Sequence, residues 1–246
     1  MDLAVFGTDM VWTTTSEVKQ AGANGGPNTL VSKPHHRFSR PIVSGSSLFW
    51  SDTTERFAAE GIAEASALVR CTLPECKDVR TIHTAGYRSL GRFAVNGPRI
   101  YFSYIQAGLS EGDIWGIATC PTSGCGDGPV VLATVGRPPV EMAVNDSYLV
   151  WSAAEGGAAL TCALPDCKGG LVPLVPRASV RDNIAIDATH AYFIDDMTRT
   201  VNRCALAGCD SPEVLADTQR LPGNLVLTDK DIYWTTADFN IVRLAK

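Results

Sequence analysis

The sequence predicts an all-β fold, a six-bladed β-propeller made of four-stranded antiparallel blades, with a last blade that ends after three strands. Three observations predict it: six copies of a repeat of about 40 residues, a turn signal inside every copy, and four equally spaced cysteine pairs. A chain of 246 residues with 45% hydrophobic residues can bury a sizeable core. We expect one propeller domain over residues 1–246, with repeats at about 1–38, 39–90, 91–138, 139–181, 182–222 and 223–246.

The first half of each repeat predicts two strands joined by a tight turn. An aliphatic run comes first, and a strand with an aromatic anchor follows it. The runs and their anchors are 3–6 with Trp12, 42–43 with Trp50, 93–96 with Phe102, 142–145 with Trp151, 184–187 with Phe193 and 225–228 with Trp234. The turn residues between them are Gly7, Gly45, Gly97, Asp146 and Asp229.

The second half of each repeat predicts two further strands. The third strand is clearest at 68–71, 200–204 and 241–243, and the fourth at 129–132 and 212–215. Four short antiparallel strands per repeat are typical of a propeller blade, in which radial repetition protects the sheet edges. The last copy stops at Lys246 after its third strand, so either the closing blade has three strands or a preceding segment supplies the fourth.

The signature in these repeats resembles that of six-bladed propellers with YWTD and NHL-like repeats. Asp231-Ile232-Tyr233-Trp234-Thr235-Thr236 is its clearest copy, and the resemblance covers essentially the whole chain. The cysteine-bearing form is similar to repeats in exported bacterial proteins. This resemblance implies the architecture and leaves the activity open, because propellers serve as lectins, scaffolds, receptors, lactonases and lyases.

The eight cysteines predict four local disulfides. Four residues separate the members of each pair: Cys71 and Cys76, Cys120 and Cys125, Cys162 and Cys167, Cys204 and Cys209. A bond at this spacing would close the turn of one hairpin, and it implies an oxidising compartment, so we expect a secreted, periplasmic or cell-surface protein. The alternative is zinc, which would require pairs on different blades to meet.

The overall charge of the chain does not identify a binding partner. The net charge is −5 and charged residues make up 19% of the chain, so we expect no nucleic-acid partner. No apolar run is long enough to span a membrane. Met1-Asp2-Leu3 opens directly on a repeat, so we expect any export signal to lie outside this sequence.

Two repeats carry insertions. The interval from the aromatic anchor to the first cysteine is 11 residues after Trp151 and Phe193, but 21 after Trp50 and 18 after Phe102. We expect residues 53–67 and 104–113 to form two long loops at the end of the blades where each chain crossover enters the next blade.

The same end is rich in arginine. Eight of the fifteen arginines fall in the crossovers: Arg37, Arg40, Arg88, Arg92, Arg137, Arg177, Arg181 and Arg220. Guanidinium groups bind carboxylate and phosphate well, so an arginine-lined channel mouth would bind an anionic small molecule, a glycan or an acidic partner segment. The alternative is that these are solvated side chains paired with local acids.

The position ten residues before each anchor is polar in all six repeats: Asp2, Arg40, Arg92, Glu141, Asn183 and Asn224. Glu141, Asn183, Asn224 and Asp2 offer oxygen ligands of the kind that calcium accepts. Resemblance to six-bladed lactonases and gluconolactonase-like hydrolases implies a calcium held at the channel mouth by Glu141, Asn183 and Asn224. Our enzyme hypothesis is a calcium-assisted hydrolase or cyclase with Glu141, Arg40 and Arg92 as its catalytic residues. The cation would polarise a carbonyl, and Arg40 and Arg92 would orient a carboxylate. The alternative is that the asparagines cap turns.

Three other side chains are weaker candidates. His35 and His36, adjacent in the first crossover, could bind a ligand or transfer protons. Trp115 could stack on a ring of a ligand. We place His83 in an outer strand and His190 in a turn at the opposite end. Two functions therefore remain, a non-catalytic binding propeller and a calcium-assisted enzyme.

Overall fold

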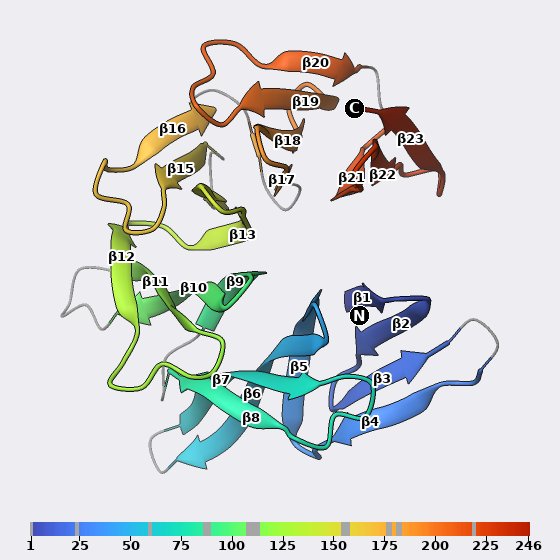
Figure 1. Cartoon of the computed structure of the whole chain (residues 1–246), viewed down its shortest axis with the longest axis vertical. Helices are drawn as coiled ribbons and strands as arrows, with labels where there is room; N and C mark the ends of the chain where they lie inside the picture. The colour runs from blue at the N-terminus through green and yellow to red at the C-terminus, as the bar shows by residue number, and fades with distance from the viewer. Residues whose placement is uncertain are drawn as a thin grey trace. The chain divides into compact units, whose positions relative to one another are not determined.

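The fold is all-β, a propeller with six blades. The computed structural model describes residues 2–22, 25–58, 61–85, 90–106, 114–153, 158–175, 179–180, 184–217 and 220–246. These form 23 strands in six antiparallel sheets, and the described residues contain no helix (Figure 1). Each sheet pairs its strands in chain order, which is the blade that the repeat predicts.

The chain divides into two compact units. The first contains residues 1–90 and 95–131, and the second contains 91–94 and 132–246. The strands of blades one to three are β1 Asp2–Phe6, β2 Asp9–Thr13, β3 Glu17–Ala21, β4 Asn28–Ser32, β5 His36–Ser44, β6 Ser47–Ala58, β7 Gly61–Thr72, β8 Arg80–Thr84, β9 Leu90–Asn96, β10 Arg99–Gln106, β11 Ile114–Pro121 and β12 Val130–Val135.

Blades four and five have four strands each, and blade six has three, as the sequence predicts. Their strands are β13 Pro139–Val144, β14 Tyr148–Ala153, β15 Ala159–Ala163, β16 Val172–Val175, β17 Ile184–Ile186, β18 His190–Asp195, β19 Thr200–Ala205, β20 Glu213–Ala216, β21 Gly223–Leu227, β22 Asp231–Thr235 and β23 Ile241–Ala245.

The Asn or Asp at the end of the innermost strand builds the first turn of a blade. The side-chain oxygen of Asn145 accepts the backbone N–H groups of Ser147 and Tyr148, at 2.9 and 2.7 Å. Its amide nitrogen donates to the backbone oxygen of Asp187 in the next blade, at 2.6 Å. One side chain therefore closes a turn and ties two blades together.

Four local disulfides are present, with Cα–Cα distances of 4.9 to 5.5 Å. The first cysteine of each pair lies on the third strand and the second lies in the connection that follows. In blade two this turn enters the core between blades one and two, where Leu73 and Cys76 are buried against Val31 and Val69. The disulfide turns thus fill the space against the preceding blade as well as closing a loop.

The prediction of a loop at residues 53–67 in blade two is wrong. The structure instead continues β6 and β7 as a regular ladder out to the pair Ala58↔Gly61. The β-branched Thr53 and Thr54 favour this extended form. The insertion of blade three lengthens β10 and β11, and residues 107–113 lie outside the described residues.

The described part of the chain has no helix long and apolar enough to cross a membrane. Strand β5 begins at His36, three residues before the repeat boundary expected at 39.

Candidate functional site

The crossover from blade one to blade two concentrates basic side chains. Residues 33–40 contain Lys33, His35, His36, Arg37 and Arg40, and no acidic residue. Backbone atoms hold this segment to the connection between β2 and β3 of blade one, because Lys33 N donates to Ser16 O at 3.0 Å and Phe38 N donates to Thr15 O at 2.9 Å. The basic segment therefore has a fixed place in the first unit.

A tight turn starts the segment. The N–H of His36 donates to the oxygen of Lys33 at 3.3 Å, with Pro34 and His35 between them. His35 has a φ of 65°, in the left-handed region. Proline followed by a residue with positive φ is the pattern of a type II turn, in which glycine or asparagine is usual. An exposed histidine with this backbone conformation is uncommon, and such residues are found more often than average at functional sites.

One buried carboxylate balances part of this charge. Asp52 is only 5% exposed and lies on β6, in the row of inward-facing residues that continues from Leu48 and Trp50. Its Oδ1 lies 2.6 Å from His36 Nδ1, and its Oδ2 accepts a hydrogen bond from Lys33 Nζ at 3.1 Å. A carboxylate at an apolar position of the strand is tolerated because both oxygens are paired.

The Asp52 contact decides how His36 is presented. A carboxylate only accepts, so Nδ1 of His36 carries the proton towards Asp52, and the hydroxyl of Thr54 also lies 3.1 Å from Nδ1. Atom Nε2 has no hydrogen-bond partner among the described residues. With the ring oriented from behind, the arrangement can present a fixed imidazole edge to a ligand.

Arg40 lies at a β-bulge. Ser39 pairs with Ser51 and Ile42 pairs with Phe49, which leaves Arg40 and Pro41 opposite a single residue of β6. Arg40 has a φ of 57°. A bulge turns a side chain away from the direction that the regular strand would give it, and bulges are frequent beside binding sites. The exposed Arg37 and the half-buried Arg40 both have interactions with neighbouring groups.

In the second unit, Arg92 and Glu141 come together. Arg92 lies on β9 and Glu141 on β13, and the guanidinium Nη1 lies 4.0 Å from the carboxylate Oε2. Both side chains are about one quarter to one third exposed, at 25% and 32%. From the sequence we expect Arg92 to orient a ligand and Glu141 to hold a cation, but in the structure the two side chains form one ion pair.

The remaining candidates are placed as follows. Arg137 and Arg220 are exposed, and Trp115 is half-buried on β11, where its backbone pairs with Ile105. Asn224 is exposed at a bulge with a φ of 49° and donates to the Thr235 hydroxyl at 3.2 Å. Candidates outside the described residues are Arg88, Arg177, Arg181 and Asn183, and of Asp2 only the backbone in β1 is described.

His83 and His190, which the sequence predicts to lie away from the site, are both on strands. His83 lies on the outer strand β8 as expected, and its partial burial lowers its pKa. The prediction that His190 lies in a turn is wrong, because His190 is the first residue of β18.

Of the four calcium candidates, only Glu141 and Asn224 have side chains among the described residues. The one acidic candidate whose side chain is described, Glu141, faces the Arg92 guanidinium, which competes with any cation for that carboxylate. In the described ranges, no three His, Cys, Asp or Glu side chains come close enough to hold a metal ion. Calcium at Glu141, Asn224, Asn183 and Asp2 remains a prediction from sequence.

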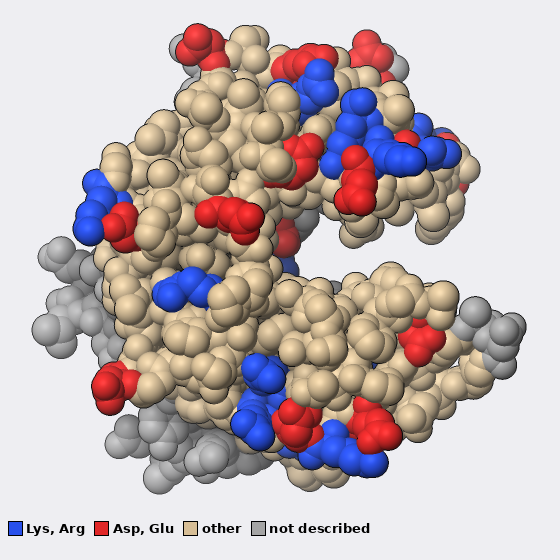
Figure 2. Space-filling model, in the orientation of Figure 1, with Lys and Arg blue, Asp and Glu red and all other residues tan. Residues whose placement is uncertain are grey.

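Elsewhere in the second unit, basic and acidic side chains lie next to one another. Figure 2 shows blue and red side chains side by side over the region of β20 and β23. The ion pairs include Arg203 with Glu213 at 2.7 Å and Arg243 with Asp231 at 3.0 Å. Such pairs neutralise each other, and in the first unit Asp52 does the same for Lys33 and His36.

Sequence reasoning identifies His36 and Arg40 but misses Lys33 and Asp52. The available signal is the apolar run Leu48–Trp50, which predicts a fully buried strand and places Asp52 on the same face as Leu48 and Trp50. An acid at a position that should be apolar indicates a buried partner, although the alternation alone does not identify that partner.

Comparisons with known proteins confirm the fold. No protein-family model and no curated protein sequence matches this chain. A chain of the nidogen/laminin complex matches with a TM-score of 0.57 and 16% identity, covering 83% of this chain and 75% of that one. BamB from Moraxella catarrhalis matches with a TM-score of 0.55 and 10% identity, over 98% of this chain and 82% of its own.

A larger protein gives a further match. Pyrococcus horikoshii acylaminoacyl peptidase aligns with a TM-score of 0.65 and 10% identity, over 98% of this chain but only 42% of that chain. All three identities are low, so these likenesses show the fold alone. The class of the protein is thus a six-bladed β-propeller with four local disulfides.

Proposed function

We propose that this protein is a binding propeller of an oxidising compartment that recognises an anionic ligand through the basic segment 33–40 of blade two. The supporting observation is the charge balance of this segment. Five basic residues lie within eight positions, and the acidic partner Asp52 is buried and already bonded to Lys33 and His36. The segment itself is therefore rich in basic groups and contains no acid, although the whole protein is acidic, with a net charge of −5.

The ligand chemistry follows from the donors. Arg37 and Arg40 offer planar guanidinium groups, which match carboxylate, phosphate or sulfate. The left-handed backbone at Arg40 and the bulge around it fix the direction of that side chain. The ligand is therefore an anion carried by a small molecule, by an acidic glycan or by the acidic segment of a partner protein.

A non-catalytic role is favoured over the calcium-assisted enzyme. The enzyme hypothesis needs Glu141 as a metal ligand, and the neighbouring Arg92 disfavours a cation there. Four disulfides support a secreted, periplasmic or cell-surface location, where reducing agents do not remove such bonds.

The test compares the wild type with the double variant Arg37→Ala/Arg40→Gly by calorimetry. Glycine suits the positive φ of position 40, so the variant should fold. The control Arg80→Ala/Lys168→Ala removes the same charge from exposed sites at the disulfide-turn ends of their blades. The probes are citrate, a heparin-derived octasaccharide and a poly-glutamate peptide, so that the three sources of the anion are separated.

We expect at least one probe to bind and its affinity to fall about tenfold or more in the Arg37/Arg40 variant, and less than about twofold in the control. Equal losses in the two variants would mean that binding follows net charge only. A complete absence of binding to all three probes would overturn the proposal.

A further inference from the structure

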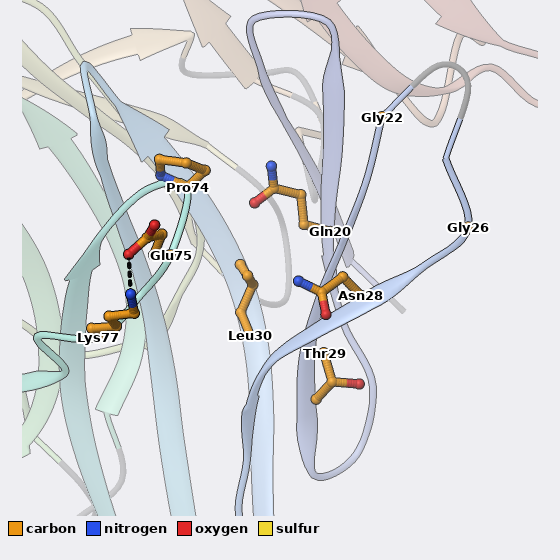
Figure 3. A pocket seen from close by; sticks show the side chains of 9 residues that line it. All are labelled: Gln20, Gly22, Gly26, Asn28, Thr29, Leu30, Pro74, Glu75 and Lys77. Carbon is orange, nitrogen blue, oxygen red and sulfur yellow. Dashed lines mark ion pairs between the residues drawn. The ribbon is translucent and has the colours of Figure 1, made fainter.

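A pocket lies between blade one and blade two at the disulfide-turn end of the first unit (Figure 3). Its volume is about 490 Å³, within the range of small-molecule sites. One side is formed by the end of β3 and the start of β4, and the other by the turn that the Cys71–Cys76 disulfide closes. The residues that line the pocket include Gln20, Asn28, Thr29, Leu30, Glu75 and Lys77.

Gln20 is the buried polar group of this pocket. It is only 9% exposed, and its Nε2 donates to Asp9 Oδ2 at 2.5 Å. Its side-chain oxygen Oε1 is buried and has no hydrogen-bond partner among the described residues. Because the Asp9 carboxylate can only accept, the amide cannot turn over to place its oxygen there. Behind the surface of the pocket, the buried Oε1 of Gln20 is therefore a fixed acceptor that lacks a donor.

Gly22 allows the Asp9–Gln20 pair to form. A Cβ atom at this position would lie 3.0 Å from Asp9 Oδ1, closer than carbon and oxygen normally approach. A larger residue would push Asp9 away from Gln20. The absence of a side chain at position 22 therefore helps to keep the Asp9–Gln20 hydrogen bond in place.

The opposite wall is held in place. The N–H of Thr72 donates to Asp78 Oδ1 at 2.7 Å, and Leu73 and Cys76 are buried at 5% and 4% exposure. On this wall Glu75 and Lys77 form an ion pair at 2.5 Å, drawn as the dashed line in Figure 3. The hydrogen bond and charge of Lys77 also lower the pKa of Glu75.

We propose that this pocket binds a neutral, polyhydroxylated ligand of monosaccharide size. Asn28 offers amide groups and Thr29 a hydroxyl, both at exposed positions on β4, and Leu30 supplies an apolar surface for C–H groups. The ion pair offers a carboxylate acceptor and an ammonium donor with no net charge. Alternating donors and acceptors with no net charge suit hydroxyl groups, which both donate and accept. This site is separate from the basic segment and does not depend on the proposed anion binding.

The chain offers a matched control for a test. Thr29 pairs with Lys19 directly after the register shift between β3 and β4. Thr81 pairs with Val69 directly after the same kind of shift between β7 and β8. Both threonines are exposed on outer strands, but only Thr29 lines the pocket.

The experiment records saturation-transfer NMR and titration shifts with D-glucose and N-acetylglucosamine, with citrate as an anionic comparison. We expect at least one sugar to bind with a Kd of about 10 mM or tighter, and citrate not to compete with it. The double variant Asn28→Ala/Thr29→Val should weaken that sugar about tenfold, and Thr81→Val should leave its affinity unchanged.

Absence of binding by both sugars, or an affinity that the Asn28/Thr29 variant does not change, would overturn the proposal. Because these two positions are exposed, loss of folding is not expected to confuse the result, and thermal unfolding of each variant checks this. A Gln20→Met variant, which keeps the size and removes the amide, should also weaken binding.

Discussion

Single side chains perform several tasks at once in this protein, and Asp187 is the clearest example. Its Oδ1 accepts the N–H groups of Thr189 and His190, both at 2.9 Å, and its Oδ2 accepts the Tyr192 hydroxyl at 2.9 Å. Lys246 Nζ lies 3.5 Å from the same carboxylate and 5.5 Å from the centre of the Tyr192 ring. The last residue of the chain is therefore tied to the first turn of blade five.

This environment sets a pH dependence. Partial burial on its own would raise the pKa of Asp187, but the hydrogen bonds from Thr189, His190 and Tyr192 and the Lys246 charge together lower it from 3.8 to about 2. A lowered pKa means that the charged form stabilises the folded state above about pH 4, and that this contribution is lost as the pH falls towards 2.

We therefore predict that the free energy of unfolding falls by about 1 kcal/mol between pH 4 and pH 2 on account of Asp187, after allowance for solvent screening. Urea unfolding at several pH values measures this. In Asp187→Asn, which can still accept the two turn N–H groups, this part of the pH dependence should vanish. An identical pH profile for wild type and variant would contradict the assignment.

At the scale of elements, the disulfide turns explain why blades two to five differ from blades one and six. Each bridge joins residues five apart and closes the connection after a third strand. In blade five, Cys204 and Leu206 are buried against Leu174 and Val175 of blade four, which repeats the packing seen between blades one and two. A short covalent loop thus holds an apolar contact between neighbouring sheets.

We predict that Cys71→Ala/Cys76→Ala lowers the free energy of unfolding by about 2 kcal/mol, because the unfolded chain gains the freedom of the opened loop. Denaturant unfolding with and without a reducing agent measures it. After reduction, the wild type should lose more stability than the variant, which has one bridge fewer to lose. A variant as stable as the wild type would show that packing alone holds this turn.

At the scale of the molecule, strand β23 of blade six is an edge strand among the described residues. Strand β23 pairs with β22 on one side, and no strand among the described residues pairs with its other side. Ile241 on this strand is 75% exposed. An apolar edge strand can pair with another chain, because its backbone N–H and C=O groups are available as a template.

We predict that Ile241→Lys reduces concentration-dependent self-association, measured by sedimentation velocity. The charge makes pairing at this edge unfavourable. Met197→Lys is the matched control, since Met197 is 79% exposed but lies in a turn between β18 and β19 and not on an edge strand. Equal effects of the two changes would indicate general solubility and not edge pairing.

The sequence by itself determines the blades and their bridges. The turn marked by Asp146, the anchors such as Trp151 and the pairing of Cys71 with Cys76 are local features, and their spacing in the chain carries the information. The same reasoning predicts a loop at residues 53–67, where the structure has a strand ladder, because interval length does not show whether an insertion forms strands.

Only the tertiary structure decided how the candidate sites are composed. Asp52 meets Lys33 across 19 positions and His36 across 16, and Gln20 meets Asp9 across 11. Arg92 and Glu141 are 49 positions apart and form one ion pair. Repeat spacing aligns strands but does not state which side chains face each other, since that depends on bulges and on the packing of one blade against the next.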